Sequence, residues 1–257
     1  MTEMDSLKRW RARIAVAHMA YDAGYYNQAI RHFRLALELA QTAELDETLK
    51  ARSQSGLAKS LAALGKFEEA ERLIRSALQI DESVSEAIVE QAEDYHQLAL
   101  LCWRSGRNSE SMSFAQKAFD LAQKAGTAAP DDLKAKLLKH FAVLAEQSGD
   151  FAETERCLNR AVEFIEGSNQ LGKNSMIYGD VLLVKVLFLA EQGRFDEAAE
   201  LYPYAMQIVA LTRGVSHPRV EEAMKIFQEM DSKDTHPNDE KLMKMASERD
   251  SSNHGIL

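Results

Sequence analysis

The chain contains 257 residues, 28% of them charged, and its formal net charge is −9 at pH 7. This acidic balance disfavours nucleic acid as a partner, because such binding depends on lysine and arginine contacts to phosphates. No segment approaches the roughly 20 apolar residues that span a bilayer, and the N-terminus lacks the apolar core of a signal peptide. We therefore expect a cytoplasmic protein without membrane insertion, in which Cys102 and Cys157 are buried, reduced thiols.

Five glycines recur at nearly constant spacing along the chain. The intervals between them are 41, 41, 43 and 44 residues, and the glycines are Gly24, Gly65, Gly106, Gly149 and Gly193. Each lies between two stretches of helical apolar periodicity, where a glycine in the left-handed conformation ends a helix at little cost. The spacing therefore predicts a helix–turn–helix unit that is repeated five times.

The expected repeats span 7–43, 47–80, 84–125, 131–167 and 174–213. A further amphipathic helix at 216–230 is expected to cap the stack, since an open end needs an element with a polar outer side. These segments form one domain over residues 1–230, and residues 231–257 are expected to be a polar, flexible tail. Long alternations of β-branched residues are absent, so we expect no sheet.

The apolar positions of each unit follow a fixed register. A small residue lies five positions after each glycine, and twelve positions after it every copy has alanine: Ala36, Ala77, Ala118, Ala161 and Ala205. Small residues on one helical face let two helices approach closely. Before the glycine, large and small residues alternate in the same way, as in Leu57, Ala58 and Leu61. The fifth unit departs from this register, because Lys185 occupies its large apolar position.

This register resembles the tetratricopeptide repeat family over residues 7–213. The usual period of that family is 34 residues, and the longer intervals here are similar to the kinesin light chain type. The resemblance implies an all-α fold: a right-handed α-solenoid of about five helix–turn–helix repeats with a C-terminal capping helix. It also implies a function in protein interaction, as a module or adaptor whose first helices line a concave groove that binds a peptide or helix.

The resemblance places the groove residues thirteen, ten, nine, six, three and two positions before each glycine. In the first four repeats these positions contain six lysines or arginines and three acidic residues. We therefore expect a locally basic groove for an acidic peptide, with two aromatic anchors, Tyr21 and Trp103. The alternative is that these positions are ordinary solvated helix faces. The candidate binding residues are Arg11, His18, Tyr21, Arg52, Lys59, His96, Gln97, Trp103, Arg104, Lys136, Lys139 and His140.

Relatives that bind chaperone tails use a clamp of lysine, asparagine and arginine. Here the asparagine positions contain His18 and Gly56, so that partner is not expected. The sequence contains no HExxH, CxxC or GxSxG motif and no phosphate-binding loop, and we expect neither an enzyme nor a cofactor or metal site.

Two alternatives stay open at this point. In the first, the protein is a self-associating scaffold that uses Trp10 and the Met-rich segment Met224–Met245, although both could instead serve the core and the cap. In the second, it is a regulatory, peptide-sensing protein that controls an enzyme in trans, which requires a conformational change on binding.

Overall fold

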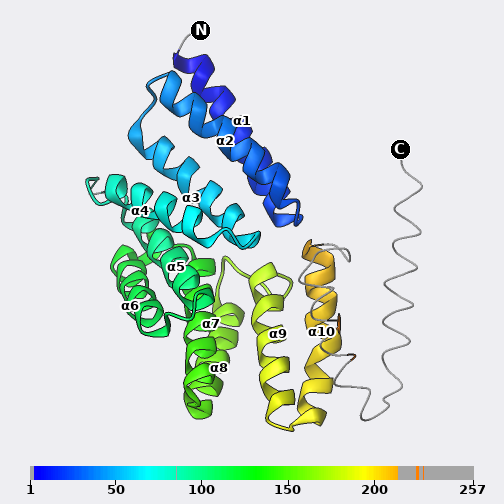
Figure 1. Ribbon diagram of the computed structural model, residues 1–257. Helices are drawn as coiled ribbons and strands as arrows, with labels where there is room; N and C mark the ends of the chain where they lie inside the picture. Colours follow the sequence, from blue (N-terminus) through cyan, green and yellow to red (C-terminus); the bar gives the residue numbers. More distant parts are fainter. Residues whose placement is uncertain (1–2, 85, 214–223, 226–227, 229–257) are drawn as a thin grey trace, which may run out of the picture. The chain divides into compact units, whose positions relative to one another are not determined.

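The computed structural model describes residues 3–84, 86–213, 224–225 and 228. In this part of the chain the fold is all-α, as predicted, with ten α-helices, one short 3₁₀ segment and no strand (Figure 1). Apart from three residues, the expected capping helix and the tail lie outside the described part. The helices are α1 (Glu3–Asp22), α2 (Tyr26–Thr42), α3 (Glu47–Ala63), α4 (Phe67–Asp81), α5 (Ile88–Arg104), α6 (Asn108–Ala125), α7 (Asp131–Ser148), α8 (Phe151–Gly167), α9 (Met176–Glu191) and α10 (Phe195–Arg213).

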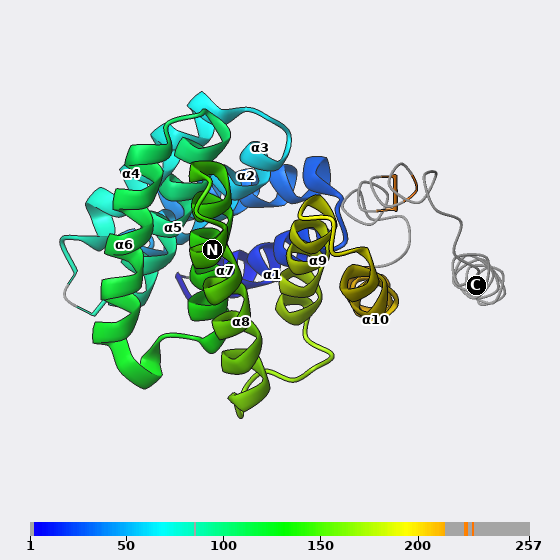
Figure 2. The same cartoon turned by 90° about the horizontal axis from the view of Figure 1, so that it is seen from below.

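The chain forms two compact units, Met1–Cys157 and Leu158–Leu257, and the boundary falls within α8. In the first unit the hairpins α1–α2, α3–α4 and α5–α6 follow one another, and each packs on the next through α2–α3, α4–α5 and α6–α7. Figure 2 shows α4 and α6 together at one side of α5. In the second unit α9 packs against α10. None of the helices in the described residues is long and apolar enough to cross a membrane.

The five recurring glycines all have the predicted left-handed conformation, with φ between 73° and 81°. At Gly65, Gly106, Gly149 and Gly193 an added Cβ would meet no atom within 4 Å. The demand for glycine at these turns is therefore conformational rather than steric.

The alanine register of the second helices is confirmed. Ala36, Ala77, Ala118, Ala161 and Ala205 each have 0% of their surface exposed. The first helices depart from their apolar register at two positions. Val16, which occupies in α1 the position that Leu57 occupies in α3, is 43% exposed. Lys185 is half-buried, and its Nζ donates a 2.9 Å hydrogen bond to Oδ1 of Asn159, which satisfies the ammonium in an apolar position.

The core of the first unit contains Phe33, Leu61 and Ile74, all less than 2% exposed. Trp10 also belongs to this core, since only 3% of its surface is exposed. Its predicted role in contacts between copies is therefore wrong, and its alternative role in the core is confirmed. The Met-rich segment that shared the self-association prediction lies almost wholly outside the described residues. Cys102 and Cys157 are both buried, as expected.

Candidate peptide-binding site

A cavity of about 280 Å³ lies in the first unit. Its walls come from α1, α3, α5 and α7, the first helices of four successive hairpins, and from the end of α4. This is the face on which the resemblance to the repeat family places the groove. The lining residues are His18, Arg52, Ser55, Gly56, Lys59, Asp81, Glu90, Glu93, Asp94, His96, Gln97, Leu133 and Lys136.

The cavity brings together half of the twelve predicted binding residues: His18, Arg52, Lys59, His96, Gln97 and Lys136. Tyr21 contacts Lys59, because Nζ of Lys59 lies 4.5 Å from the centroid of the Tyr21 ring. Arg104 is outside the cavity lining, and its Nη1 donates a 2.9 Å hydrogen bond to the carbonyl oxygen of Ala62 on α3. The exposed Arg11 and the half-buried Lys139 are outside the cavity lining.

The basic side of the cavity is centred on Lys59. Burial and, to a smaller extent, the positive charge of Lys136 lower the pKa of Lys59 to about 8. The carboxylates of Asp22, Glu93 and Asp132 act in the opposite direction. Lys136 forms an ion pair with Asp132, one turn before it on α7. A carboxylate that bound beside Lys59 would stabilise the charged form of this lysine. The two groups could then form a charge-assisted hydrogen bond.

The cavity lining also contains four acidic residues, Asp81, Glu90, Glu93 and Asp94, and none of them was among the predicted binding residues. Asp94 is only 1% exposed, and its Oδ1 accepts a 2.7 Å hydrogen bond from Oγ of Ser55. The pKa of Asp94 is raised to about 8, mainly by burial and also by the charges of Asp81, Glu93 and Glu90, while the hydrogen bond from Ser55 acts in the opposite direction. Its Oδ2 has no hydrogen-bond partner among the described residues. The cavity is therefore mixed in charge, not uniformly basic.

The sequence contained a partial signal for these missed residues. Glu90 and Leu133 lie sixteen positions before Gly106 and Gly149, one helical turn before the first groove position that we carried over. Extending the register by one turn would have found both of them. Asp94 has no such signal, because it lies between two groove positions and an aspartate there is ordinarily solvated.

Two predicted residues, Trp103 and His140, form a cluster with His96 next to the cavity. The ring centroids of His96 and His140 are 5.7 Å apart, and those of Trp103 and His140 are 6.3 Å apart. Oγ of Ser111 lies 3.0 Å from Nε2 of His140. Trp103 thus contacts His140 and is outside the cavity lining where it was expected as an anchor.

Both histidines of this cluster are neutral. Burial lowers the pKa of His140 to about 4, and burial together with the charge of His140 lowers the pKa of His96 well below its usual range. Neutral imidazoles can bind a metal ion, but no group of three or more metal-ligating side chains occurs in the described part of the chain. Of the two, His96 lines the cavity and His140 lies behind it.

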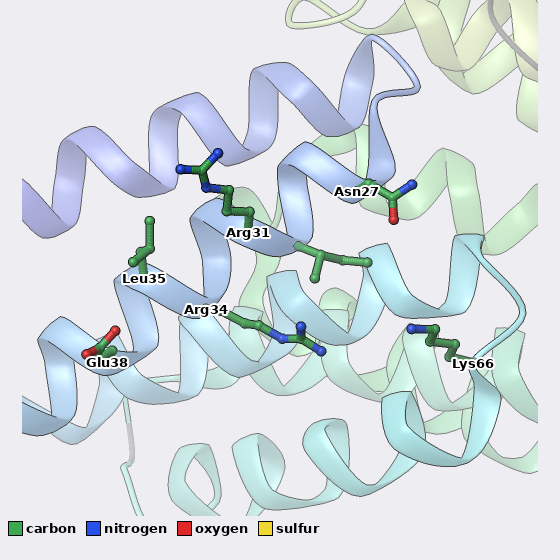
Figure 3. A pocket seen from close by; sticks show the side chains of 7 residues that line it. Asn27, Arg31, Arg34, Leu35, Glu38 and Lys66 are labelled. Atoms are coloured by element: carbon green, nitrogen blue, oxygen red, sulfur yellow. The ribbon is translucent and has the colours of Figure 1, made fainter.

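A second, more open pocket of about 390 Å³ lies along α2. Figure 3 shows Arg34 of α2 and Lys66, the residue before α4, approaching the same space, whereas Arg31 points away from Lys66. These three side chains are exposed, and Arg34 forms a 3.5 Å ion pair with Glu69. Exposed pairs of this kind contribute little energy, so the cavity lined by the first helices is the better candidate site.

Comparison with solved structures shows a shared fold at low sequence identity. The chain aligns with aspartyl phosphate phosphatase F from Bacillus subtilis at a TM-score of 0.67 and 16% identity, over 98% of this chain and 62% of that one. It aligns with a Rap protein complexed with competence and sporulation factor at a TM-score of 0.67 and 14% identity, over 86% of this chain and 64% of that one. The chain thus spans less than two thirds of the length of these two proteins.

Kinesin light chain repeats are also similar. A structure of nearly identical repeats from a Podosopora anserina putative kinesin light chain aligns at a TM-score of 0.53 and 17% identity, over 80% of this chain and 97% of that one. No curated protein sequence matches the chain significantly. Two tetratricopeptide repeat family models match residues 10–83 and 92–124. The matched repeats, the all-α fold and the register of glycines and buried alanines agree, and these two segments of the chain are tetratricopeptide repeats.

Proposed function

We propose that this protein is a non-catalytic interaction module that binds a short peptide, or one helix of a partner, in the cavity of its first unit. The observation that carries the proposal is the position of Lys59 and Lys136, which line one cavity from α3 and α7. Both come from the first helices of their hairpins, so the repeat itself places their ammonium groups at one site. The finer proposal is that the bound segment presents a carboxylate to these lysines.

Two similar structures support a peptide as the ligand. One is the Rap protein complexed with competence and sporulation factor. The other is the Rap conjugation gene regulator of the plasmid pLS20 in complex with the Phr* peptide, which aligns at a TM-score of 0.69 and 13% identity over 96% of this chain and 75% of that one. At such identities the likeness concerns the fold, and the argument for binding depends on the cavity of this chain.

The test is a pull-down with the double variant K59E/K136E, followed by mass spectrometry. A matched control is K8E/K124E, which changes charge equally at two exposed lysines outside the cavity lining. We expect partners captured by the wild type and the control to be lost from the cavity variant. If the cavity variant keeps the same partners while circular dichroism shows it folded, the proposed site is wrong. Peptides of a captured partner then test the carboxylate, because replacing aspartate or glutamate by the amide should weaken binding about tenfold or more.

A further inference from the structure

We propose that the same cavity contains a cation-binding subsite at Asp94, so that the peptide it accepts carries a guanidinium or ammonium group as well as a carboxylate. This inference depends on the proposed function and specifies the chemistry of the ligand. Its basis is a buried carboxylate that lines the cavity with one oxygen bonded and the other unpartnered among the described residues.

The unpartnered oxygen is the first step of the argument. Oδ1 of Asp94 accepts the hydrogen bond from Ser55, which fixes the orientation of the carboxyl group on α5 against α3. Oδ2 has no such partner in the described part of the chain, and a buried polar atom costs free energy unless a partner reaches it. A guanidinium is a planar donor that can meet both oxygens of a carboxylate, and its charge would replace the missing hydration.

The charges around Asp94 also favour a cation. Acidic groups face it from α4 and α5, namely Asp81, Glu90 and Glu93. Two residues of α7 line the cavity. Leu133 is apolar, and the charge of Lys136 is paired with that of Asp132. Arg52 of α3 is directed to Glu90, at 3.9 Å, and no ion pair between Asp94 and a basic side chain is described. Acidic side chains therefore surround Asp94 more closely than basic ones do, which favours a cation at this position.

The two subsites are close enough for one short segment. Ser55 and Lys59 are one turn apart on α3, and both line the same cavity of about 280 Å³. A segment with a basic and an acidic side chain can therefore place its cation at Asp94 and its carboxylate at Lys59. Because burial disfavours the charged form of Asp94, an entering cation also releases the proton that this carboxyl group otherwise holds.

The first experiment selects phage-displayed random heptapeptides on the immobilised full-length protein, with D94N and K59Q/K136Q selected in parallel. We expect the wild type to enrich peptides that contain both arginine or lysine and aspartate or glutamate. D94N should lose the preference for basic residues and keep the acidic one, and K59Q/K136Q should do the reverse. Enrichment of acidic peptides without basic residues overturns the Asp94 subsite and leaves the proposed function standing. No enrichment at all overturns both.

The second experiment separates binding from a merely structural role of Asp94. An enriched peptide and its arginine-to-citrulline analogue, which keeps the shape but loses the charge, are titrated calorimetrically into wild type, D94N and S55A. We expect citrulline to weaken binding to the wild type about tenfold to a hundredfold, as for hydrogen bonds to charged groups, and to D94N less than about threefold. S55A keeps the carboxylate and should keep the discrimination.

Proton release supplies an independent readout. Titrations near pH 7 in buffers of different ionisation enthalpy should show release of a proton with the arginine peptide and not with citrulline. Equal discrimination of the two peptides by wild type and folded D94N overturns the proposal, as does the absence of any difference in proton release.

Discussion

Nε1 of Trp10 donates a 2.9 Å hydrogen bond to Oγ of Ser53, which joins α1 to α3 across 43 residues of sequence. Both side chains are buried, with exposed fractions of 3% and 0%. Oγ of Ser53 in turn donates to the carbonyl oxygen of Leu49, one turn earlier on α3. The indole therefore fixes the position of two first helices, which are two walls of the cavity.

Replacing Trp10 should destabilise the first unit according to what each variant removes. W10F keeps an aromatic ring but loses the hydrogen bond, and we expect a loss of about 1–2 kcal/mol in the free energy of unfolding. W10A also leaves a cavity, and we expect about 3–5 kcal/mol. Urea unfolding followed by circular dichroism measures both. In a double-mutant cycle with S53A, the coupling between Trp10 and Ser53 should be about 0.5–1.5 kcal/mol, and a coupling near zero would contradict the role of this bond.

Gly56 is required by packing in the middle of a helix. A Cβ at this position would lie 2.2 Å from Cε1 of Phe33, although alanine ordinarily favours a helix over glycine by about 1 kcal/mol. We therefore expect G56A to destabilise the protein by about 1–3 kcal/mol, as overpacking does. G167A is the control, because a Cβ there meets no atom within 4 Å and the residue has no positive φ. Thermal unfolding measures both, and F33L should rescue G56A in part; a stabilised G56A would contradict the packing argument.

The buried carboxyl group of Asp94 should make stability depend on pH. Its pKa of about 8 in the folded protein exceeds the ordinary 3.8, so the folded state holds a proton that the unfolded chain releases between about pH 4 and pH 8. The stability contributed by this proton is fully present below about pH 4 and is lost as the pH rises towards 8. Relative to D94N, the wild type should lose at least about 1 kcal/mol between pH 5 and pH 8. Urea unfolding at these pH values is the measurement, and a difference between the two proteins that is constant with pH would contradict it.

The neutral histidine cluster should make stability depend on pH in the opposite direction. The pKa of His140 is lowered from 6.5 to about 4, because burial disfavours the imidazolium. The unfolded chain therefore binds a proton between about pH 6.5 and pH 4 that the folded protein does not, and stability falls as the pH falls through this window. In proton NMR spectra, the ring signals of His96 and His140 should hardly move between pH 8 and pH 5.5. Urea-unfolded protein is the control, with histidines that titrate near 6.5; a midpoint near 6.5 in the folded protein would show that the cluster is hydrated.

The sequence predicted the parts of this molecule that depend on local rules. Gly65 ends a helix with positive φ, and Ala77 is buried at its expected register position, because turn geometry and helical periodicity act within a few residues. The face proposed for the groove came from the resemblance to the repeat family, and Lys59 and Lys136, two of the residues on it, both line the cavity. Asp94 and Trp103 were different. Asp94 lies between two groove positions and is buried, whereas Trp103 occupies a groove position but contacts His140. Both outcomes depend on the next hairpin and not on the helix that carries the residue.

The mixed charge of the cavity has a kinetic consequence. Its lining combines three basic side chains, Arg52, Lys59 and Lys136, with four acidic ones, Asp81, Glu90, Glu93 and Asp94. Opposite charges so close together produce little field at a distance, so the cavity cannot accelerate encounters by long-range steering. Association should then proceed at an ordinary rate of about 10⁵–10⁶ M⁻¹s⁻¹ with a weak dependence on ionic strength. Ligands with the charges in the wrong order would be rejected by fast dissociation, so that residence time, rather than capture, sets the selectivity of this protein.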